Sequence, residues 1–359
     1  MRILHAVLSG GFYGSERYCI DLAIAQARSG HDVVVLLTDG DSACAQQFRQ
    51  SITEASGEPA HAGTVRLVEM PSFVPAWLQR PLAAAMLIRI RPDIVHTHLN
   101  PAARRIGRVA RRLGIPHVLT LHLDYNPREH AAIDGLVALS AKQREQIQDF
   151  AGEVAVIWNW LPSRVEAALA RVDPADVARL RREWRADEAT VVFGSVGRLM
   201  PEKGMDTLIR AFKLAFPVER ESVRLIIVGE GDDRAALERL AAEEPRIVLA
   251  GAQSQIAPFY RAFDVFVSAA RFEPFSLAII EAMAASCRLI CTSIHGTVEF
   301  VIDRRVLWTE PDRDGSLALQ LAAAMARKRE RFAYDMSPFA LPRAVAEIDA
   351  FYRRVIARS

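Results

Sequence analysis

The amino-acid sequence predicts an α/β protein made of two doubly wound domains. Two stretches about 190 residues apart share one order of apolar strand, glycine-containing loop, amphipathic helix and strand, which is the βαβ unit of a parallel sheet. Short apolar strands alternate with helical stretches along the rest of the chain. The 359 residues are enough for two domains of about 150 residues each. A ligand cleft between the domains is then the default expectation.

The first βαβ unit lies at the N-terminus. A strand at 3–8 leads into a loop with Gly10, Gly11 and Gly14, and a helix and a strand at 33–37 follow. The second unit has a strand at 191–196, a loop, a helix and a strand at 224–228. Further strands are expected at 93–96, 118–122, 135–138, 247–250, 265–268 and 289–292.

The domain boundary is expected near 165–188. The segment 158–163 interrupts the strand pattern, and a charged helical stretch at 176–185 precedes the second unit. These features predict an N-terminal domain at 1–165 and a C-terminal domain at 188–340. The amphipathic helix at 341–359 can pack on either domain, and packing back onto the first is one expectation.

Composition excludes several classes of protein. With 51% hydrophobic residues, 25% charged residues and a formal charge of +2, the chain is globular and has no overall basic field for nucleic acid. Its longest charge-free apolar stretch, 81–88, is 8 residues long and too short to cross a bilayer. The first residues are interpreted as a strand and not as a signal peptide. The four cysteines lack metal-ligand spacing, which favours a reducing, cytoplasmic compartment.

The segment 271–284 carries the most informative motif. Ser276 follows an apolar strand and is placed to begin a helix. The backbone amides of Phe275, Ser276 and Leu277 would then face outward, where a phosphate is favoured. Glu273 and Glu281 flank these amides and could hold hydroxyl-rich groups on either side of a diphosphate. Taken alone, the segment is more often a helix with one acidic cap and one solvated glutamate.

Two cations precede this segment in the same predicted sheet. Arg198 follows the strand at 191–196, and Lys203 stands at the start of the next helix. Both would lie at the carboxyl edge of the sheet, where ligands of open α/β sheets bind. Arg198, Lys203, the helix start and the two glutamates together predict a site for a nucleoside diphosphate that carries a sugar.

The order of these motifs resembles a known family across essentially the whole chain. The motifs are GGFYGSERYCIDLAIAQARSGHDV, DIVHTH, VGRLMPEKG, LIIVGEGDDRAALERLA and FEPFSLAIIEAMA. The chain is similar to the retaining glycosyltransferases of family 4, which have the GT-B fold of two Rossmann-like domains facing a cleft. The Glu-x7-Glu spacing with the upstream Gly-Arg and Lys-Gly is specific to that wider group.

The resemblance implies roles for the candidate donor residues. It implies that Arg198 and Lys203 bind the donor diphosphate, that Glu281 binds the ribose and that Glu273 faces the donor sugar. The glycine loop is implied to approach the reaction centre, with Gly11 on the donor side and Gly14 on the acceptor side.

The chain departs from the family pattern at three places. Pro274 and Ser276 stand where glycines are common, and Ile294-His295-Gly296 stands where Gly-Gly is usual. Because proline has no backbone N–H, Pro274 removes one donor from the predicted phosphate site.

Histidines close two strands of the predicted first sheet. His98 follows the strand at 93–96, and His122 ends the strand at 118–122. Single histidines are usually structural. Similar enzymes have a histidine at the position of His122 that positions acceptor and donor sugar, which makes His122 a catalytic candidate and leaves His98 on the acceptor side. A metal site at His96-x-His98 is rejected because no third ligand stands nearby in the sequence.

Two other patterns are treated as chance matches. Asp39-Gly-Asp41 could be a metal-binding Asp-x-Asp, but such triplets are common, and Asp312-Arg-Asp314 repeats the pattern. Asp39 also lies where a dehydrogenase would hold ribose. That alternative lacks the G-x-G start and leaves the second-domain motifs unexplained.

The helix expected at 101–113 has one basic face. Its apolar residues share one side, and its five arginines lie within one face of about 120° with no acidic residue among them. A solvated surface is the simpler interpretation, and an anionic membrane or lipid-linked acceptor is the alternative, with 73–78 as an apolar anchor. The arginines are Arg104, Arg105, Arg108, Arg111 and Arg112.

The expected function is a metal-independent, retaining glycosyltransferase of hexosyltransferase type without a cofactor. It would transfer a sugar from a nucleotide diphosphate sugar to a hydroxyl of a glycan or lipid-linked acceptor. Bacterial envelope glycan or lipopolysaccharide assembly, in the cytoplasm and peripherally on the inner face of the cell membrane, is the expected setting. Open alternatives are a nucleotide-sugar epimerase or phosphorylase on the same fold, or a catalytically silent nucleotide-sugar binding subunit.

Overall fold

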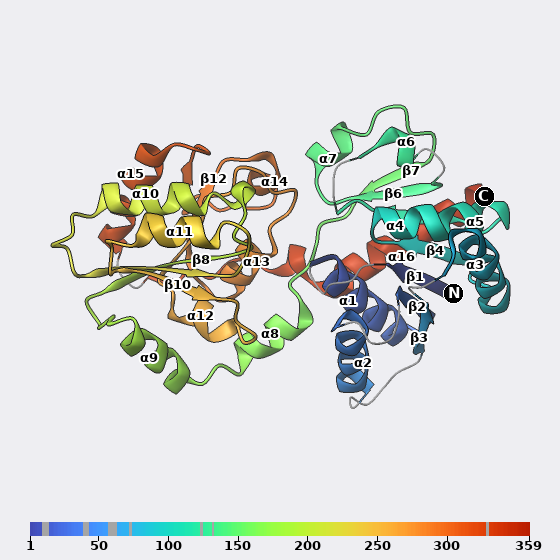
Figure 1. Ribbon diagram of the computed structural model, residues 1–359, viewed down its shortest axis with the longest axis horizontal. Coiled ribbons are helices and arrows are strands. Elements are labelled where there is room, and N and C mark those ends of the chain that lie inside the picture. Colours follow the sequence, from blue (N-terminus) through green and yellow to red (C-terminus); the bar gives the residue numbers. More distant parts are fainter. Residues whose placement is uncertain are drawn as a thin grey trace. The chain divides into compact units, whose positions relative to one another are not determined.

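A computed structural model describes residues 1–8, 14–38, 43–56, 63–71, 74–122, 125–130, 133–327 and 330–359 (Figure 1). The chain forms two compact units. The first comprises Met1–Pro162 together with Phe339–Ser359, and the second comprises Ser163–Pro338. The last helix, α16 (Leu341–Arg358), therefore belongs to the first unit, where it packs beside α1 (Gly14–Arg28).

Among the described residues, the first unit has a seven-stranded parallel sheet in the order β3-β2-β1-β4-β5-β6-β7. The strands are β1 (Arg2–Val7), β2 (Asp32–Thr38), β3 (Thr64–Met70), β4 (Ile94–Thr97), β5 (His117–Thr120), β6 (Gly135–Ala138) and β7 (Glu153–Val156). The other helices are α2 (Ala43–Ser56), α3 (Ala76–Ile90), α4 (Asn100–Ala102), α5 (Arg108–Arg112), α6 (Pro127–His130) and α7 (Ala141–Glu145).

Helices cover both faces of this sheet, so its central strands are apolar without alternation. Val33 and Val35 pack with Ile20 of α1 on one face, while Val34 and its neighbours pack with Leu87 of α3 on the other. The odd and even residues of one strand thus supply two separate cores, which is the expected arrangement of a doubly wound domain.

The second unit has a six-stranded parallel sheet in the order β10-β9-β8-β11-β12-β13 within the described residues. Its strands are β8 (Val191–Val196), β9 (Val223–Val228), β10 (Ile247–Gly251), β11 (Val265–Ser268), β12 (Arg288–Thr292) and β13 (Leu307–Thr309). Its helices are α8 (Ser163–Ala170), α9 (Pro174–Glu183), α10 (Met205–Ala215), α11 (Arg234–Ala241), α12 (Ala257–Ala262), α13 (Leu277–Ala284), α14 (His295–Val298) and α15 (Asp314–Ala324). The 3-10 turns are Pro201–Lys203, Met325–Arg327 and Ser337–Phe339.

The segment expected to separate the domains is part of the second unit. Helix α9 starts at Pro174, where the Asp173 carboxylate accepts a hydrogen bond from the Ala175 amide at 2.8 Å. Trp184, just after α9, packs its ring on Phe259 and Phe263, with centroids 5.7 and 6.1 Å away. This burial of a large aromatic side chain attaches residues 163–187 to the second sheet.

The basic helix expected at 101–113 is continuous but not regular. A π-helical turn, Ala103–Gly107, lies between α4 and α5. All five arginines are exposed, as expected, and Ile106 and Ala110 are buried against the sheet. The fold also brings in an acidic partner that the helix itself lacks, because Glu129 of α6 forms an ion pair with Arg104 at 2.7 Å.

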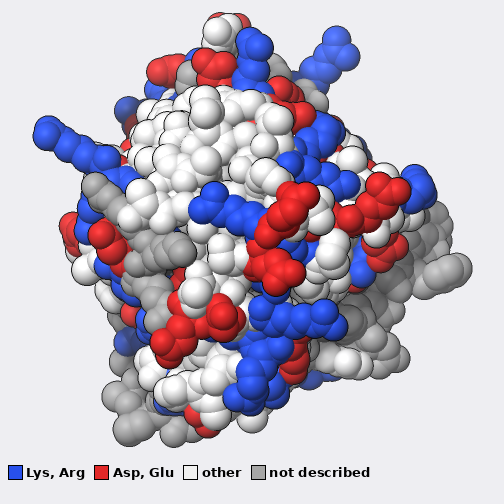
Figure 2. All heavy atoms as spheres, turned by 90° about the vertical axis from the view of Figure 1, so that its left-hand side faces the viewer, with Lys and Arg blue, Asp and Glu red and all other residues white. Residues whose placement is uncertain are grey.

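Among the described residues, no helix combines the length and apolar character needed to cross a membrane. The surface of the second unit is mixed in charge. Figure 2 shows its face with lysine and arginine side chains interspersed with aspartate and glutamate around an uncharged area.

Candidate functional site

The strand order places a switch point in each sheet. In the second sheet β8 pairs with β9 on one side and β11 on the other, so the loops that follow β8 and β11 leave in opposite directions. Ligands of open α/β sheets bind outside the carboxyl ends of the strands at this point. The loops at 197–204 and 269–276, which carry the predicted donor residues, both lie there.

Two glycines, one in the loop at 197–204 and one in α14, allow close packing against the loop at 269–276. Gly204 has φ 65°, and a Cβ atom there would lie 2.0 Å from the Ala269 carbonyl oxygen. A Cβ on Gly296 would lie 1.8 Å from the Glu273 carbonyl oxygen. Both distances are far inside van der Waals contact, so only glycine fits. The segment Ile294-His295-Gly296 stands where the family usually has Gly-Gly, and this packing requires the glycine at position 296.

Lys203 and Glu273, from the two loops, form an ion pair between Nζ and Oε2. Their side chains are only 20% and 16% exposed, so solvent screens the pair less than an ordinary surface pair. Two residues predicted for the donor site therefore lie in direct contact, 70 positions apart in the chain.

Arg198 lies in the same loop but faces solvent. Its side chain is 61% exposed, and its guanidinium lies 3.7 Å from the Glu202 carboxylate. Arg271, which the sequence did not single out, instead links the two loops: its amide donates to the Glu202 carbonyl at 2.8 Å and its guanidinium pairs with Asp206 at 2.8 Å. Arg271 thus holds the Lys203 loop against the loop of Glu273.

Helix α13 begins next to this ion pair. Ser276 is its N-cap residue with extended backbone, as predicted, although its side chain makes no capping hydrogen bond among the described residues. Phe275 stacks on Phe300 with ring centroids 4.3 Å apart, which fixes the chain just before the helix. The first amides of an α-helix, here from Leu277 onward, have no carbonyl partner within the helix and carry the positive end of its dipole.

Glu281, one turn into α13, is buried and not solvated. Its carboxylate accepts a hydrogen bond from the Tyr260 hydroxyl at 2.6 Å, and Tyr260 is completely buried. The simpler interpretation of Glu281 as a solvated surface residue is therefore wrong. Tyr260 reaches Glu281 from α12, and nothing in the sequence around it indicates that contact.

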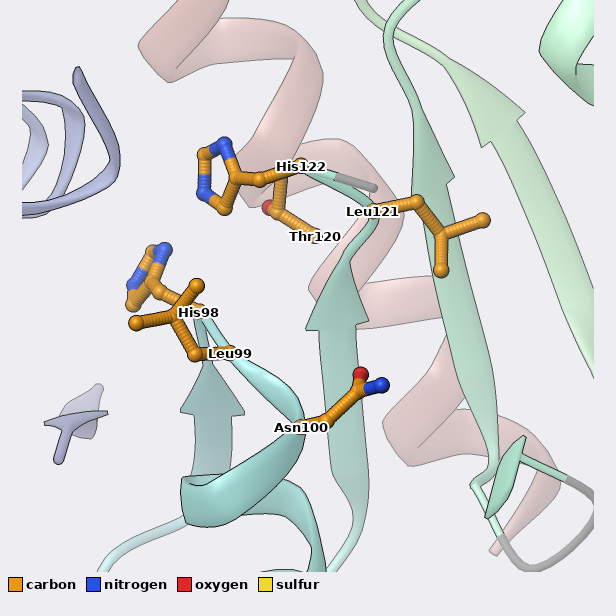
Figure 3. Close-up of a pocket in the computed structure, with 6 residues that line it drawn as sticks. All are labelled: His98, Leu99, Asn100, Thr120, Leu121 and His122. Atoms are coloured by element: carbon orange, nitrogen blue, oxygen red, sulfur yellow. The ribbon is translucent and has the colours of Figure 1, made fainter. Parts of the chain in front are cut away.

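The first unit has a pocket at the carboxyl ends of β4 and β5. His98, Leu99, Asn100, Thr120, Leu121 and His122 line it (Figure 3). Figure 3 shows the imidazole rings of His98 and His122 directed to the same side, away from the Leu121 side chain. Because β4 pairs with β1, this pocket lies beside the switch point of the first sheet.

His98 belongs to a buried group of histidines. Ring nitrogens of His5, His96 and His98 lie within 4.8 Å of one another. The sequence shows no third ligand close to His96 and His98, but the fold supplies one, His5 of β1. The lack of a third ligand is therefore a wrong reason to exclude a metal site. Both His96 nitrogens are nevertheless already in hydrogen bonds, Nδ1 with the Tyr352 hydroxyl at 2.5 Å and Nε2 with Thr120 Oγ1 at 2.8 Å.

Burial keeps this group neutral. It lowers the pKa of His5 and of His122 to about 4 and that of His117 to about 3. Burial, followed by the neighbouring histidines, lowers the pKa of His96 and His98 well below the ordinary value. Desolvation disfavours the charged imidazolium, so each ring carries one N–H at neutral pH.

Several sequence-based candidates lie elsewhere. Gly10, Gly11 and the Asp39-Gly-Asp41 triplet lie outside the described residues, and Gly14 is the first residue of α1. Asp312 and Asp314 pair with Arg271 and Arg210, respectively. This second Asp-x-Asp triplet therefore serves ion pairs of the fold.

Two family models match the chain in succession. Residues 12–164 match the model described as Glycosyltransferase Family 4, and residues 190–328 match Glycosyl transferases group 1. The chain belongs to glycosyltransferase family 4. The matches meet near the division between the two units, so each unit of the glycosyltransferase corresponds to one model.

Related sequences and solved structures agree with this assignment. The glycosyltransferase is 28% identical over 297 residues to a GDP-mannose-dependent alpha-mannosyltransferase of Mycolicibacterium smegmatis, covering 76% of this chain and 74% of the relative. It is 29% identical over 248 residues to a D-inositol 3-phosphate glycosyltransferase of Acidothermus cellulolyticus, covering 59% and 54%. Anabaena HepE in complex with UDP and glucose superposes with a TM-score of 0.81 at 20% identity, covering 99% and 100% of the two chains. The predicted GT-B fold is confirmed.

Proposed function

We propose that this nucleotide-sugar glycosyltransferase transfers a hexose with retention of configuration and without a metal ion. The observation that carries the proposal is the ion pair of Lys203 and Glu273 beside the N-terminus of α13. The cation and the helix start at this switch point suit a negatively charged diphosphate, and the carboxylate suits the hydroxyl groups of the attached sugar as a hydrogen-bond acceptor. No cofactor is needed in this scheme, because the nucleotide sugar is itself the activated substrate.

In this proposal the donor lies along the loops of the second unit. Lys203 and Arg198 bind the diphosphate, with the amides of Phe275, Ser276 and Leu277 at the start of α13. Pro274 contributes no N–H, so the phosphate contacts come from the residues after it. Glu281, held by Tyr260, accepts hydrogen bonds from the ribose hydroxyls, and Glu273 faces the sugar.

The chemical step breaks the bond between the sugar C1 and the diphosphate oxygen. The acceptor oxygen bonds to C1 on the same face, and the acceptor proton goes to the departing phosphate. Negative charge grows on the diphosphate as the bond breaks, and fixed cations and helix-end dipoles stabilise it. In this proposal Lys203, Arg198 and α13 take the place of a divalent cation.

The acceptor side is assigned to the first unit, with Gly14, His98 and His122. We propose a glycan or lipid-linked acceptor of bacterial envelope or lipopolysaccharide assembly, used on the cytoplasmic side of the membrane. A structural neighbour, WaaG, is described as a glycosyltransferase involved in lipopolysaccharide biosynthesis, with a TM-score of 0.69 at 17% identity. A catalytically silent binding subunit would keep the donor site and transfer nothing.

The experiment that tests the function is a thermal-shift panel of nucleotide sugars that includes GDP-mannose and UDP-glucose. The protein is then incubated with each stabilising donor and a set of sugar and lipid-linked acceptors, and NMR determines the anomeric configuration of any product. We expect stabilisation by at least one donor and an α-linked product from an α-linked donor. Stabilisation without transfer or hydrolysis would indicate a silent subunit, and an inverted product would refute retention.

Alanine variants of the two glutamates are expected to have different defects, one in nucleotide affinity and the other in turnover. Glu281→Ala removes the proposed ribose contact and the hydrogen bond that the buried Tyr260 hydroxyl donates to Glu281, so nucleotide affinity should fall about tenfold or more. Glu273→Ala should leave nucleotide affinity nearly unchanged and lower turnover. Titration calorimetry with GDP and UDP, together with initial rates, measures both quantities. Exposed Glu310 gives a control, Glu310→Ala, that should change neither. Normal binding and turnover in both site variants would refute the donor site.

We also propose that the arginine face of α4–α5 docks on an anionic membrane. Arg104 is partly neutralised by Glu129, which leaves four arginines, each contributing roughly 1 kcal/mol near an anionic leaflet. Geometry and salt screening halve the summed binding free energy to about 2 kcal/mol, which corresponds to a reversible association. Trp77 of neighbouring α3 is 75% exposed and could insert as an apolar anchor.

The membrane proposal predicts salt-sensitive co-sedimentation with phosphatidylglycerol vesicles. The variant Arg105→Glu/Arg108→Glu/Arg111→Glu should sediment much less than the wild type at low salt. A matched control in the second unit, Arg182→Glu/Arg220→Glu/Arg239→Glu, changes the net charge equally at three exposed arginines and should sediment like the wild type. Equal loss in both variants, or binding indifferent to salt, would contradict a specific docking face.

A further inference from the structure

A line of hydrogen bonds crosses the core of the first unit and ends at His98. Gln26 Nε2 donates to Asp349 Oδ1 of α16 at 2.9 Å. Gln26 Oε1 lies 2.8 Å from His5 Nε2, and His5 Nδ1 lies 2.9 Å from His98 Nε2. All four side chains are buried, and His5, Gln26 and His98 are completely inaccessible to solvent.

The carboxylate at one end fixes the direction of every bond in this line. Asp349 can only accept, so Gln26 must turn its NH2 group to Asp349 and its carbonyl oxygen to His5. His5 then carries its hydrogen on Nε2. A neutral imidazole has one N–H, so His5 Nδ1 is a lone pair that must accept from His98 Nε2. The single hydrogen of His98 is thereby placed on Nε2, and His98 Nδ1 is left as an acceptor.

That acceptor has no partner in the part of the chain that the structure describes. His98 Nδ1 is buried and unpaired, as is His122 Nε2, and both residues line the pocket in Figure 3. Buried polar atoms are nearly always satisfied in folded proteins. Tyr18 packs its ring near both histidines, with centroids 5.5 and 5.0 Å away, so an aromatic side chain lies beside both imidazole rings. The uncharged lone pair of His98 Nδ1, buried beside an aromatic ring, is suited to accept a hydrogen bond from a hydroxyl group.

We propose that His98 Nδ1 accepts a hydrogen bond from a sugar hydroxyl of the acceptor substrate, and that Asp349, Gln26 and His5 hold His98 in the tautomer that this requires. The three are positioning residues, since they act on the substrate only through His98. The identity of the ligand rests on the proposed function, whereas the tautomer follows from the hydrogen bonds alone.

A metal ion in the group of His5, His96 and His98 is the competing interpretation. Three histidine nitrogens are a common ligand set for zinc. Such an ion would have to displace the Tyr352 hydroxyl or Thr120 from His96, and it would break the bond between His5 and His98. The hydrogen-bonded arrangement uses these nitrogens as they lie, so the geometry favours it.

The tautomers can be read directly by long-range 1H–15N NMR on protein labelled at its histidines, with His98 and His5 assigned through His98→Asn and His5→Asn. We expect both His5 and His98 to carry hydrogen on Nε2. The Nε2–H tautomer should exceed the Nδ1–H tautomer by at least about tenfold, which corresponds to the free energy of one hydrogen bond. Hydrogen on Nδ1 of His98 would overturn the proposal. So would a metal ion, found by elemental analysis of the purified protein, whose removal changes the two resonances.

Two variants test the relay against a matched control. Gln26→Leu should convert His98 to a mixture of tautomers, because His5 loses its fixed partner. Gln143 is also a buried glutamine of the first unit with two hydrogen bonds, so Gln143→Leu should destabilise the fold comparably and leave His98 unchanged. Asp349→Asn is the milder replacement if Gln26→Leu does not fold, since an amide can face Gln26 in either orientation. An unchanged His98 in the relay variant that folds would refute the relay.

The ligand is tested with methyl α-D-mannopyranoside as a hydroxyl-bearing probe. Its titration should shift the His98 Nδ1 resonance in a dose-dependent way and leave His117, a buried histidine outside the pocket, unmoved. No shift at His98 up to the solubility limit would overturn the hydroxyl assignment. The donor panel distinguishes the two proposals: lack of donor binding with a shifted His98 would refute the proposed function and leave the hydroxyl site standing.

Discussion

Replacing Lys203 with alanine is expected to reduce turnover by a factor on the order of 10² or more, because the variant loses a fixed charge from the leaving diphosphate. The ion pair with Glu273 makes the effect larger than at an exposed lysine, since the variant also leaves a partly buried carboxylate without its cation. Arg198→Ala is expected to act in the same direction. Its side chain is exposed and must turn inward to reach a phosphate.

Initial rates with the donor identified by the panel measure this effect, and turnover should persist in EDTA. Lys213 provides the matched control, because it lies in the last turn of α10, the helix that follows the same loop, and donates to the Leu240 carbonyl. Lys213→Ala should retain the wild-type rate. Near-normal turnover in Lys203→Ala would remove Lys203 from the donor site. Complete and reversible loss of activity in EDTA would revive the metal interpretation of Asp39-Gly-Asp41.

Mild acid is expected to unfold the first unit before the second. An unfolded chain takes up a proton at each histidine near pH 6.5, whereas the folded unit does so only near pH 4 or below. The unfolded state therefore binds more protons as the pH falls below about 6.5, and stability declines. The five histidines concerned are His5, His96, His98, His117 and His122.

His5, His117 and His122 each remove about 1.5 kcal/mol of stability between pH 6.5 and pH 5. The three together remove about 5 kcal/mol, which is comparable to the whole stability of a typical domain, and His96 and His98 act in the same direction. The second unit contains a single histidine, His295. Hydrogen exchange followed by mass spectrometry at pH 7 and pH 5 should show lost protection in β4 and β5 and retained protection in β8 and β11. Equal protection of both units at pH 5, or earlier loss in the second, would contradict this.

The sequence predicts the central strands well because both of their faces are covered by helices. The strands at 135–138, 191–196 and 265–268 begin and end as expected. The sequence does not predict β3, β7 and β13, all of which are edge strands. An edge strand has one neighbour and is partly exposed, so Thr64–Met70 mixes charged and apolar residues and shows no continuous apolar run.

The sequence predicts only those residues of the candidate site that belong to recognisable motifs. The position of Lys203 and Glu273 in adjoining loops follows from the strand order, because both loops leave the carboxyl edge at one switch point. Residues that contact the site from other helices and strands are not marked by any sequence motif. Tyr260 comes from α12, Arg271 joins α10, and His5 precedes His98 by 93 positions. These contacts depend on side-chain packing between distant segments, which periodicity and spacing do not encode.

Helix α16 makes the first unit discontinuous, and this affects the order in which the protein can fold during synthesis. The ribosome completes residues 163–338 before it makes α16, so every residue of the second unit is available first. Until Asp349 and Tyr352 emerge, Gln26 and His96 lack two of their buried hydrogen-bond partners. Domains generally fold as units during synthesis. The first unit, although its N-terminal part is made first, can therefore complete its core only after the whole second unit has been synthesised.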